Sequence, residues 1–371
     1  MIDLATLAPM DVAGRLPRLR QRLPEAGCDA LLVTNLANIA YLTGFTGSAG
    51  LLLVLPDRVV LATDGRYRYQ SAEQLAAARV DADVVVGPVA EQRDGLGRAA
   101  GGVARLGLEA TSVTWARQRT FAEEWFEAAE LVPTTGVVEE LRRVKDAGEI
   151  DRMRAAAAVA DAALAAVLPT VVAGTTEVEL AMALDFAIRR AGASGNSFET
   201  IVASGPNGAK PHARPSNRAI GPGELVVVDF GAVVGGYCSD MTRTVCLGPP
   251  ASPTLARMVE VVAESQRAGV AAVRAGRPAV EVDQVCRDVI DDAGWGEAFS
   301  HSTGHGVGLD IHEAPTLSKT SGDTLAAGHV VTVEPGVYLP EHGGVRIEDT
   351  VVVTQSGCEP LTMSPKELVL Q

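Results

Sequence analysis

The sequence of 371 residues predicts two domains, an α/β domain over residues 1–135 and an α+β domain over residues 136–371. Three observations predict this division. Short apolar runs alternate with helical patterns in the N-terminal part. Residues 131–136 contain proline and glycine, as a connection does. After residue 136, the order of two helices followed by strands occurs twice, which indicates duplicated halves related by a pseudo-two-fold axis.

The first domain is expected to begin with an amphipathic helix over residues 13–27, because Leu16, Leu19 and Leu23 recur at helical spacing between arginines. Short apolar runs follow, with helical patterns between them. The expected strands cover residues 29–34, 51–55, 59–63, 84–86 and 106–108. The expected helices cover residues 67–78 and 115–129. Such alternation predicts a largely parallel or mixed sheet.

The second domain opens with a helical pattern of mixed charge over residues 137–168, typical of a salt-bridged surface. The expected helices cover residues 147–168, 176–192, 254–275 and 279–293. The expected strands cover residues 198–203, 225–231, 237–247, 330–334, 345–353 and 358–361. The longest apolar run, residues 155–174, contains Asp161 and Pro169, so we expect a buried helix rather than a membrane span.

Charge and cysteine usage limit the partners and the compartment. The net charge is −14, from 46 acidic and 32 basic residues, which argues against a nucleic-acid or anionic-membrane partner. The five cysteines are scattered without a Cys-x-x-Cys pair, which suits free thiols in a reducing cytoplasm. Residues 1–20 lack the apolar core of a signal peptide, so a cytoplasmic location is expected.

Two β-rich runs flank Gly235-Gly236, which predicts a hairpin with a two-residue turn. In that register Gly231 opposes Asp240, and Asp229 shares the face of Gly231, diagonally across from Asp240. Two carboxylates on an otherwise apolar face repel each other and lose hydration, and a bound cation relieves both costs. The alternative is a pair of solvated carboxylates on an exposed sheet face.

Two further acidic residues lie in apolar strands. Glu334 ends the run 330–334 just before a turn, and Glu348 lies within the expected strand 345–353. A buried carboxylate in a strand needs a metal or an ionic partner. By alternation Arg346 shares a face with Glu348, so Arg346 could supply that partner without any metal.

All six histidines follow residue 210, namely His212, His301, His305, His312, His329 and His342. His301 and His305 have the spacing of a zinc-binding helix, but the glycines around them disfavour a helix, and Ser302 stands where that motif has Glu. A metalloprotease zinc helix is therefore excluded. A glycine-dense loop instead lets the backbone and the imidazoles approach a ligand closely.

Five segments together resemble the metal-binding motifs of the pita-bread metallopeptidases, a family that includes aminopeptidase P, prolidase and methionine aminopeptidase. They are VVVDFG, GYCSDMTRT, HSTGHGVGLDIHE, TVEPGVY and GVRIEDT, in family order within about residues 140–371. The segments NIAYLTGFTGSAG and LATDGRYRYQ are similar to the extra N-terminal domain of aminopeptidase P, prolidase and creatinase. The resemblance implies a creatinase/prolidase-type N-terminal domain before a catalytic pita-bread domain.

The resemblance also implies a dinuclear metal site, whose five ligands are Asp229, Asp240, His305, Glu334 and Glu348. Asp240 and Glu348 would bridge two divalent ions. Manganese is the expected metal, with cobalt and zinc as alternatives. Metals about 3.5–4 Å apart can hold a bridging hydroxide that attacks the scissile carbonyl. Glu334 is then the expected proton shuttle to the leaving nitrogen.

Further residues match family positions around the substrate. The resemblance assigns His301, His312 and His212 to the peptide near the scissile bond, and Arg346 and Tyr338 to support of the metal ligands or the carbonyl. His329 and His342 match no functional position, and His329 is expected to be a core histidine.

The activity implied is an exopeptidase that hydrolyses Xaa-Pro bonds in proline-containing peptides. Aminopeptidase P activity on tripeptides or longer peptides is the first expectation, and prolidase activity on dipeptides is the alternative. Two other classes share the fold, a metal-free creatinase-like hydrolase and a non-catalytic binding protein. Both lose ligands, whereas all five are present here. A homodimer or a tetramer is expected from the family.

Overall fold

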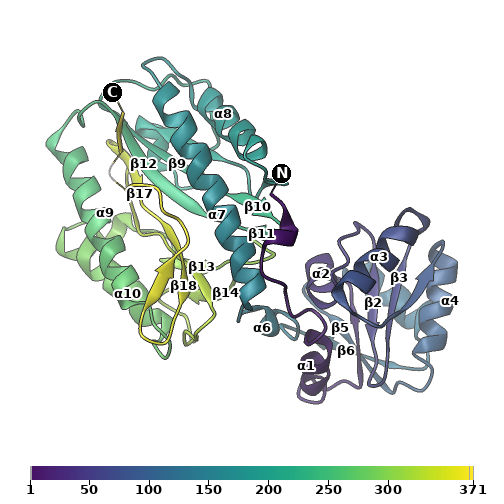
Figure 1. Cartoon of the computed structure of the whole chain (residues 1–371). Coiled ribbons are helices and arrows are strands. Elements are labelled where there is room, and N and C mark those ends of the chain that lie inside the picture. The colour runs from purple at the N-terminus through teal and green to yellow at the C-terminus, as the bar shows by residue number, and fades with distance from the viewer. Residues whose placement is uncertain (1, 367, 371) are drawn as a thin grey trace. The chain divides into compact units, whose positions relative to one another are not determined.

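The computed structural model describes residues 2–366 and 368–370 (Figure 1). Contacts within the chain form two compact units, one from Met10–Arg142 and the other from Met1–Pro9 together with Arg143–Gln371. Helix α6 (Glu139–Arg142) belongs to the smaller unit by this division. The domain boundary expected between residues 135 and 136 stays a prediction.

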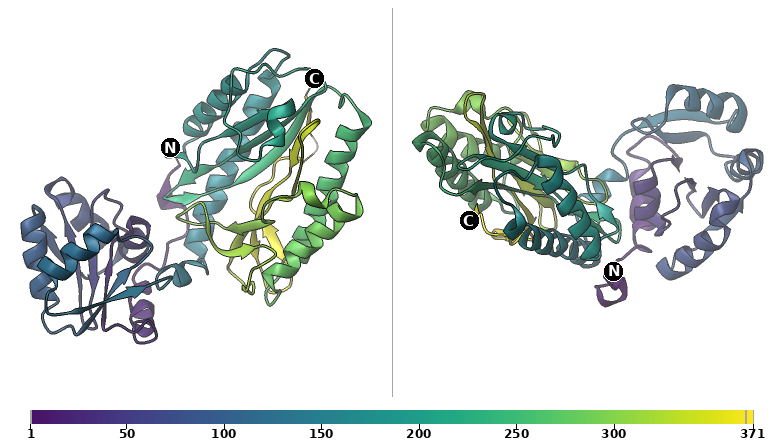
Figure 2. Two further views of the ribbon diagram at one scale, coloured as in Figure 1. Left: turned by 180° about the vertical axis from the view of Figure 1, so that it is seen from behind. Right: turned by 90° about the horizontal axis from the view of Figure 1, so that it is seen from above.

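The smaller unit is built on a six-stranded sheet with the order β4-β3-β2-β1-β5-β6. Strand β1 pairs antiparallel with β2 and parallel with β5, so the sheet is mixed, as expected. Figure 2 shows this smaller unit, in purple to blue, from two further sides. The strands are β1 (Ala30–Val33), β2 (Leu51–Val54), β3 (Val59–Thr63), β4 (Asp83–Val86), β5 (Arg105–Glu109) and β6 (Glu130–Thr134). The helices are α1 (Arg15–Arg22), α2 (Leu36–Thr43), α3 (Arg68–Ala78), α4 (Val89–Ala99) and α5 (Trp115–Thr120).

The sequence patterns do not predict α2, α4 or β6. Helix α2 begins after Asn35, whose side chain accepts a hydrogen bond from the Ala37 amide, and it ends at Gly44 with φ +74°. Strand β6 contains Pro133, which argues against a central strand. It is an edge strand, where a residue without an N–H is tolerated.

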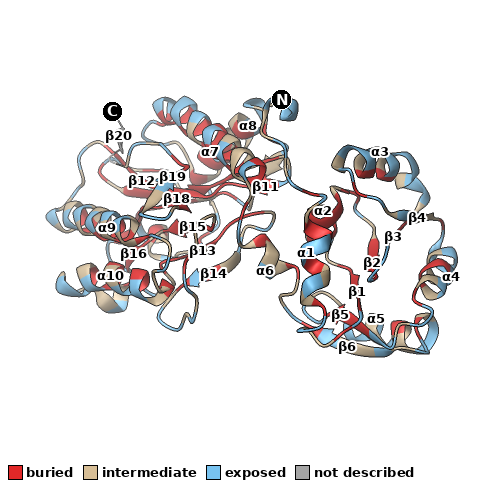
Figure 3. Ribbon diagram, turned by 60° about the horizontal axis from the view of Figure 1, so that its bottom comes forward, coloured by how far each residue is buried: buried red, intermediate tan, exposed pale blue. Residues whose placement is uncertain are grey.

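The larger unit contains two pairs of helices, and each pair packs on its own apolar core. The helices are α7 (Ala147–Val167), α8 (Glu177–Arg190), α9 (Pro253–Ala272) and α10 (Ala279–Asp292). Helices α7 and α8 pack with β8, β9, β10 and β12, whereas α9 and α10 pack with β15, β17 and β18. Figure 3 shows that the strands are mostly buried and that the helices keep exposed outer faces.

The strands of the larger unit form four sheets with the orders β11-β10-β7, β20-β12-β9-β8, β14-β13-β15-β18-β19 and β16-β17. In the first half they are β7 (Gly195–Asn196), β8 (Ile201–Ser204), β9 (Leu225–Phe230), β10 (Ala232–Val234), β11 (Tyr237–Cys238) and β12 (Met241–Leu247). In the second half they are β13 (Gly304–Gly306), β14 (Glu313–Leu317), β15 (Val330–Val333), β16 (Gly336–Leu339), β17 (Gly343–Arg346), β18 (Asp349–Val353), β19 (Cys358–Pro360) and β20 (Leu368–Leu370).

The two helix pairs repeat each other in detail. The residue before each second helix, Thr176 before α8 and Pro278 before α10, forms an isolated antiparallel bridge. Each second helix is followed by a glycine with positive φ, Gly192 at +111° and Gly294 at +85°. The larger unit therefore has the duplicated halves that the order of elements predicts.

Helix α7, with the 3₁₀ turn after it, is long and apolar enough to cross a membrane when judged by length and composition alone. Half of its most apolar window is buried within the fold. Ala156, Ala160 and Leu164 belong to the first apolar core. This environment is that of a core helix in a folded unit.

The hairpin that contains two of the acidic residues has the expected register, with Val234 opposite Tyr237. Strands β9 and β12 continue this register, but the pairing is interrupted at Gly231 and Asp240, where the hairpin passes from one sheet to another. A Cβ atom at Gly231 would lie 2.0 Å from the carbonyl oxygen of Ser239, so a side chain cannot be accommodated there. The close approach of the two strands thus requires glycine.

The strand expected over residues 345–353 is in fact two strands. Strand β17 ends at Arg346 and pairs with β16, whereas β18 begins at Asp349 and pairs with β15. Glu348 therefore lies in the break between two strands rather than inside one. Its amide donates to the carbonyl of Thr242, which holds the break against β12.

Candidate active site

Five side chains from separate elements of the larger unit converge on one centre. The ligand atoms of Asp229, Asp240 and Glu348 all lie within 4.8 Å of one another. His305 Nε2 lies 3.6 Å from Asp240 Oδ2 and 3.3 Å from Glu334 Oε1. Asp240 thus joins the acidic triad to the His305–Glu334 pair. The structure brings together all five residues that the sequence marks as candidate ligands.

The ring of His305 is oriented for binding through Nε2. Its Nδ1 lies 2.9 Å from the carbonyl oxygen of Gly306. A carbonyl can only accept, so Nδ1 carries the proton and Nε2 keeps its lone pair toward Asp240 and Glu334. Burial lowers the pKa of His305, which favours this neutral form.

Two buried threonines fix the carboxylates from behind. The hydroxyl of Thr332 accepts a hydrogen bond from the His305 amide at 3.0 Å and donates to Glu334 Oε1 at 3.1 Å. The hydroxyl of Thr242 donates to Glu348 Oε2 at 2.7 Å. Neither threonine stands out in the sequence. The sequence pattern that could identify them is a threonine two residues from a carboxylate, on the same strand face, in an otherwise apolar run.

The carboxylates crowd one another in a buried site. Burial, followed by the charges of Glu348, Asp229 and Glu334, raises the pKa of Asp240 well above its ordinary value. Burial and the charges of Glu334 and Asp229 do the same to Glu348. Burial raises the pKa of Glu334 to about 7. Without a cation the cluster therefore resists ionisation.

The donor set fits a divalent cation. No group in the described part of the chain donates a hydrogen bond to Asp229 Oδ1 or Glu348 Oε1, although both atoms are buried. Buried carboxylate oxygens without partners are costly unless they bind a metal. Oxygen donors combined with one imidazole suit divalent ions such as manganese, cobalt or zinc.

Arg346 serves a different carboxylate from the one suggested by strand alternation. Its Nη2 lies 2.5 Å from Asp229 Oδ2, while its Nε donates to the hydroxyl of Thr242. Arg346 therefore neutralises Asp229 directly and reaches Glu348 only through Thr242. The suggestion that an Arg346–Glu348 ion pair replaces a metal is wrong for this structure.

A hydrogen-bonded chain runs from Arg346 to His301. Arg346 Nη1 donates to the Tyr338 hydroxyl at 2.8 Å, and that hydroxyl lies 2.8 Å from His301 Nε2. His301 Nδ1 donates to the carbonyl of Ser302 at 2.7 Å, so Nε2 accepts from Tyr338. Burial, assisted by the charge of Arg346, lowers the pKa of His301 to about 4. His301 is therefore neutral at physiological pH.

The other two predicted histidines also lie near the centre. The ring of His312 packs edge-on against His305, with centroids 4.4 Å apart. His212 is exposed, and its charge acts on the pKa values of Glu334, His301 and His312. In contrast, His342 is exposed, whereas His329 is buried and its Nδ1 accepts a hydrogen bond from the Ala326 amide, as in a core histidine.

The loop that bears His212 is held by one buried carboxylate that the sequence patterns do not identify. Glu177, the first residue of α8, receives hydrogen bonds from the amide and hydroxyl of Ser204, from the side chain of Asn207, and from the amide and hydroxyl of Ser216. These bonds outweigh burial and lower the pKa of Glu177. Glu177 thus closes the loop at both ends.

Comparison with known proteins agrees with this geometry. Residues 151–355 match metallopeptidase family M24, and residues 15–144 match the creatinase/prolidase N-terminal domain. An Xaa-Pro dipeptidase of Pyrococcus horikoshii is 32% identical over 97% of this chain and all of its own length.

Solved structures are similar over nearly the whole chain. An Xaa-Pro dipeptidase from Bacillus anthracis superposes with a TM-score of 0.93 at 41% identity, covering 97% of this chain and 100% of that one. An X-Pro aminopeptidase from Thermotoga maritima has a TM-score of 0.86 at 34% identity, covering 95% and 99%. The two halves with their converging carboxylates, the N-terminal unit before them and these whole-length likenesses lead to one assignment: the chain belongs to metallopeptidase family M24 and has its pita-bread fold.

Proposed function

We propose that this protein is an Xaa-Pro dipeptidase, which hydrolyses the bond before proline in a dipeptide. The main observation behind the proposal is the convergence of five ligand-capable side chains in a buried site. Relatives named Xaa-Pro dipeptidase match nearly the whole chain at 32% and 33% identity. The sequence patterns favour aminopeptidase P, but these relatives support the dipeptidase better.

The residues proposed to hold two divalent ions are Asp229, Asp240, His305, Glu334 and Glu348. Manganese is the proposed metal, with cobalt or zinc as alternatives. When bound, the ions would supply Lewis acidity to the scissile carbonyl and an activated water.

The protein's own groups would move the protons and orient the peptide. Glu334, which lies beside His305 in the ligand cluster, can take a proton from the attacking water and release it to the proline nitrogen as that nitrogen leaves. His301 is neutral and its Nε2 is held by Tyr338, so its ring can lie in a fixed orientation beside the peptide. His312 and His212 are also proposed to contact the peptide. Arg346 keeps Tyr338 and Asp229 in place.

The test is a comparison of hydrolysis rates on Ala-Pro and Ala-Pro-Ala, with Ala-Ala as a control, after reconstitution with Mn²⁺. We expect Ala-Pro to be hydrolysed fastest and Ala-Ala hardly at all. Faster hydrolysis of Ala-Pro-Ala would reverse the assignment in favour of an aminopeptidase. The His305→Ala variant should lose activity on every peptide, which ties the hydrolysis to this site.

An Xaa-Pro aminopeptidase is the second candidate. It is supported by the structural likeness to the Thermotoga maritima X-Pro aminopeptidase and by putative Xaa-Pro aminopeptidases of two Mycoplasma species, at 34% and 36% identity. A creatinase-like hydrolase or a binding protein remains the alternative of another class. Elemental analysis of the purified protein distinguishes these alternatives from the peptidase, because about two divalent ions per chain are expected for the peptidase.

A homodimer, or a tetramer, in the cytoplasm is also proposed. All five cysteines are free thiols, which supports a reducing compartment. Light scattering coupled to size-exclusion chromatography would measure the oligomeric state.

A further inference from the structure

The loop that bears His301 rests on two charged residues of helix α10. Arg287 Nε and Nη2 donate to the two carboxylate oxygens of Asp283 at 2.7 and 3.1 Å, one turn apart on the helix. The same guanidinium donates to the carbonyls of Phe299 at 3.0 Å and His301 at 2.5 Å. Asp283 in turn accepts a hydrogen bond from the Thr303 amide at 3.1 Å. Backbone groups of three alternate loop residues are thus fixed from behind.

Arg287 also contacts the His301 imidazole indirectly, through the aromatic ring of Phe299. The Arg287 guanidinium lies 4.2 Å from the centroid of the Phe299 ring. The Phe299 ring in turn meets the His301 ring edge-on, with centroids 5.1 Å apart and an interplanar angle of 82°. One guanidinium therefore fixes both the backbone of His301 and the neighbour against which its ring packs.

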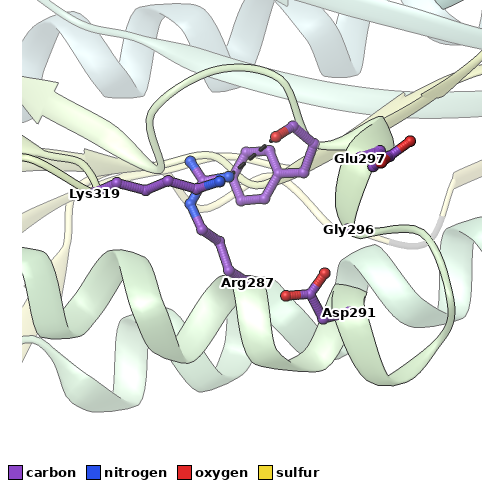
Figure 4. Close-up of a pocket in the computed structure, with 6 residues that line it drawn as sticks. Arg287, Asp291, Gly296, Glu297 and Lys319 are labelled. Atoms are coloured by element: carbon purple, nitrogen blue, oxygen red, sulfur yellow. Dashed lines mark hydrogen bonds between the residues drawn. The ribbon is translucent and has the colours of Figure 1, made fainter.

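The surroundings show that the arrangement is not simple packing. The Asp283 side chain is 1% exposed and that of Arg287 9% exposed. A buried ion pair gives little net stability compared with apolar residues of similar volume. Figure 4 shows Arg287 extending from α10 with its hydrogen bond dashed, beside a hollow of ≈ 240 Å³ that Asp291, Glu297 and Lys319 also line. Three hydrogen bonds between this buried ion pair and one loop, two donated by Arg287 and one accepted by Asp283, indicate a requirement for geometry at that loop.

We infer that Arg287, held by Asp283, is a positioning residue that sets the orientation of His301 for the reaction. The inference rests on the proposed function, because it assigns His301 to the peptide. Within the described residues, the hydrogen bonds of Arg287 go to Asp283, Phe299 and His301 rather than to the ligand cluster or Tyr338, so it acts through His301. Replacement of the guanidinium would leave His301 present but differently oriented.

The first test measures the loop itself and needs no catalysis. In Arg287→Lys, the ammonium can still pair with Asp283 but cannot serve Asp283 and both loop carbonyls in the fork geometry of arginine. In the double variant Asp283→Leu/Arg287→Met, no buried charge is left unpaired, so folding is preserved. We expect hydrogen–deuterium exchange over residues 299–303 to speed up by about tenfold in both variants. Unchanged exchange in both would overturn the inference.

The second test asks whether Arg287 acts through His301. On Ala-Pro, Arg287→Lys should lower kcat by about 10–100-fold with little change in KM or metal content. In a His301→Ala background the same change should have no further effect, because the residue being positioned is gone. An equal further loss of kcat in that background would overturn the inference.

The duplicated half supplies a matched control. Asp185 of α8 holds the corresponding loop through Asn196 Nδ2 at 2.5 Å and Thr200 Oγ1 at 2.6 Å, and that loop has no histidine. Asp185→Asn should change kcat by the same factor in the wild type and in the His301→Ala background. If the wild type hydrolyses no Xaa-Pro peptide, the proposed function fails, and the exchange measurement still decides whether Arg287 holds the loop.

Discussion

Two threonine hydroxyls determine where the reactive groups of this site point. Thr332 binds both His305 and Glu334, and Thr242 binds both Glu348 and Arg346. A hydroxyl can donate one hydrogen bond and accept others, so each threonine links two groups that have to keep a fixed separation. Neither threonine is exposed, which keeps water from competing for these bonds.

Thr332→Val tests this link because valine has the same shape without the hydroxyl. The His305 amide loses its acceptor and Glu334 loses a donor. We expect a loss of about 1–3 kcal/mol in unfolding free energy and about tenfold weaker metal binding. Thermal unfolding and calorimetric titration with Mn²⁺ measure the two effects. Thr332→Ser keeps the hydroxyl and should bind metal nearly as the wild type does, and equal behaviour of both variants would contradict the role.

His329 provides a pH prediction away from the carboxylate cluster. Burial, followed by the charges of Arg143 and Lys145, lowers its pKa to about 4, against 6.5 ordinarily. The unfolded chain therefore binds the proton more readily, and the stability contributed by neutral His329 is lost as pH falls from 6.5 toward 4. His329→Asn keeps an acceptor for Ala326 but does not titrate.

Urea unfolding at pH 7 and pH 5 compares the two proteins. Between these values the wild type should lose about 2 kcal/mol relative to His329→Asn. A difference between the two proteins that does not change with pH would contradict the prediction.

The five candidate ligands can be predicted from sequence because charged and imidazole groups stand out in apolar or glycine-rich runs. Thr242 and Thr332 cannot be picked out in the same way. Threonine is common in strands, and its partner becomes known only when the distant strand that faces it is placed. The same limit hides Arg287 and Asp283, whose spacing of four residues is that of any helical ion pair.

At the scale of elements, the second helix of each half fixes a loop that bears a histidine. Helix α8 uses Glu177 for the His212 loop, and α10 uses Asp283 with Arg287 for the His301 loop. A helix packed into an apolar core is rigid, so polar groups on its inner face can hold a glycine-rich loop that would otherwise be mobile.

Glu177→Gln should loosen the His212 loop. Glutamine retains the shape, but its amide nitrogen replaces one of the two accepting oxygens, so the buried donors of either Ser204 or Ser216 are left unpaired. We expect a loss of about 2–3 kcal/mol in unfolding free energy and a raised KM for dipeptide. Glu260→Gln, the same change at an exposed site, is the control and should stay within about 0.5 kcal/mol. An effect no larger than the control's would contradict the role of Glu177.

Strands and turns can be predicted from sequence where the local pattern by itself determines the pairing partner. Gly235-Gly236 determines the hairpin register because the turn itself sets it. The break at Glu348 is invisible in the sequence, since side chains alternate through Arg346 and Glu348 as in one strand. What changes there is the hydrogen-bonding partner, from β16 to β15, and no local pattern records it.

At the scale of the larger unit, the carboxylate cluster is shared between the duplicated halves. Asp229 and Asp240 come from the first half, and His305, Glu334 and Glu348 come from the second. Each half alone brings negatively charged carboxylates together and does not supply enough positive charge to neutralise them. A divalent cation bound there would therefore join the halves as well as provide chemistry, because it would remove a repulsion that acts across their junction.

Metal removal should expose this repulsion with a defined pH dependence. Ligands bind a metal when deprotonated, and the raised pKa values of Asp240, Glu348 and Glu334 mean that protons compete with the metal up to about pH 7. Stabilisation by Mn²⁺ should therefore be small at pH 5.5 and grow through pH 7. At 100 times the dissociation constant it reaches about 2.7 kcal/mol.

Thermal unfolding of chelator-treated protein, with and without Mn²⁺ at pH 5.5, 7 and 8, measures this dependence. The Asp229→Asn/Glu348→Gln variant is the control, because it removes two of the candidate ligands and much of the repulsion together. It should be at least as stable as the metal-free wild type at pH 8 and gain little from Mn²⁺. Equal stabilisation of the wild type at all three pH values would mean that the carboxylates are already ionised without metal, and the halves would then be held together by their packing alone.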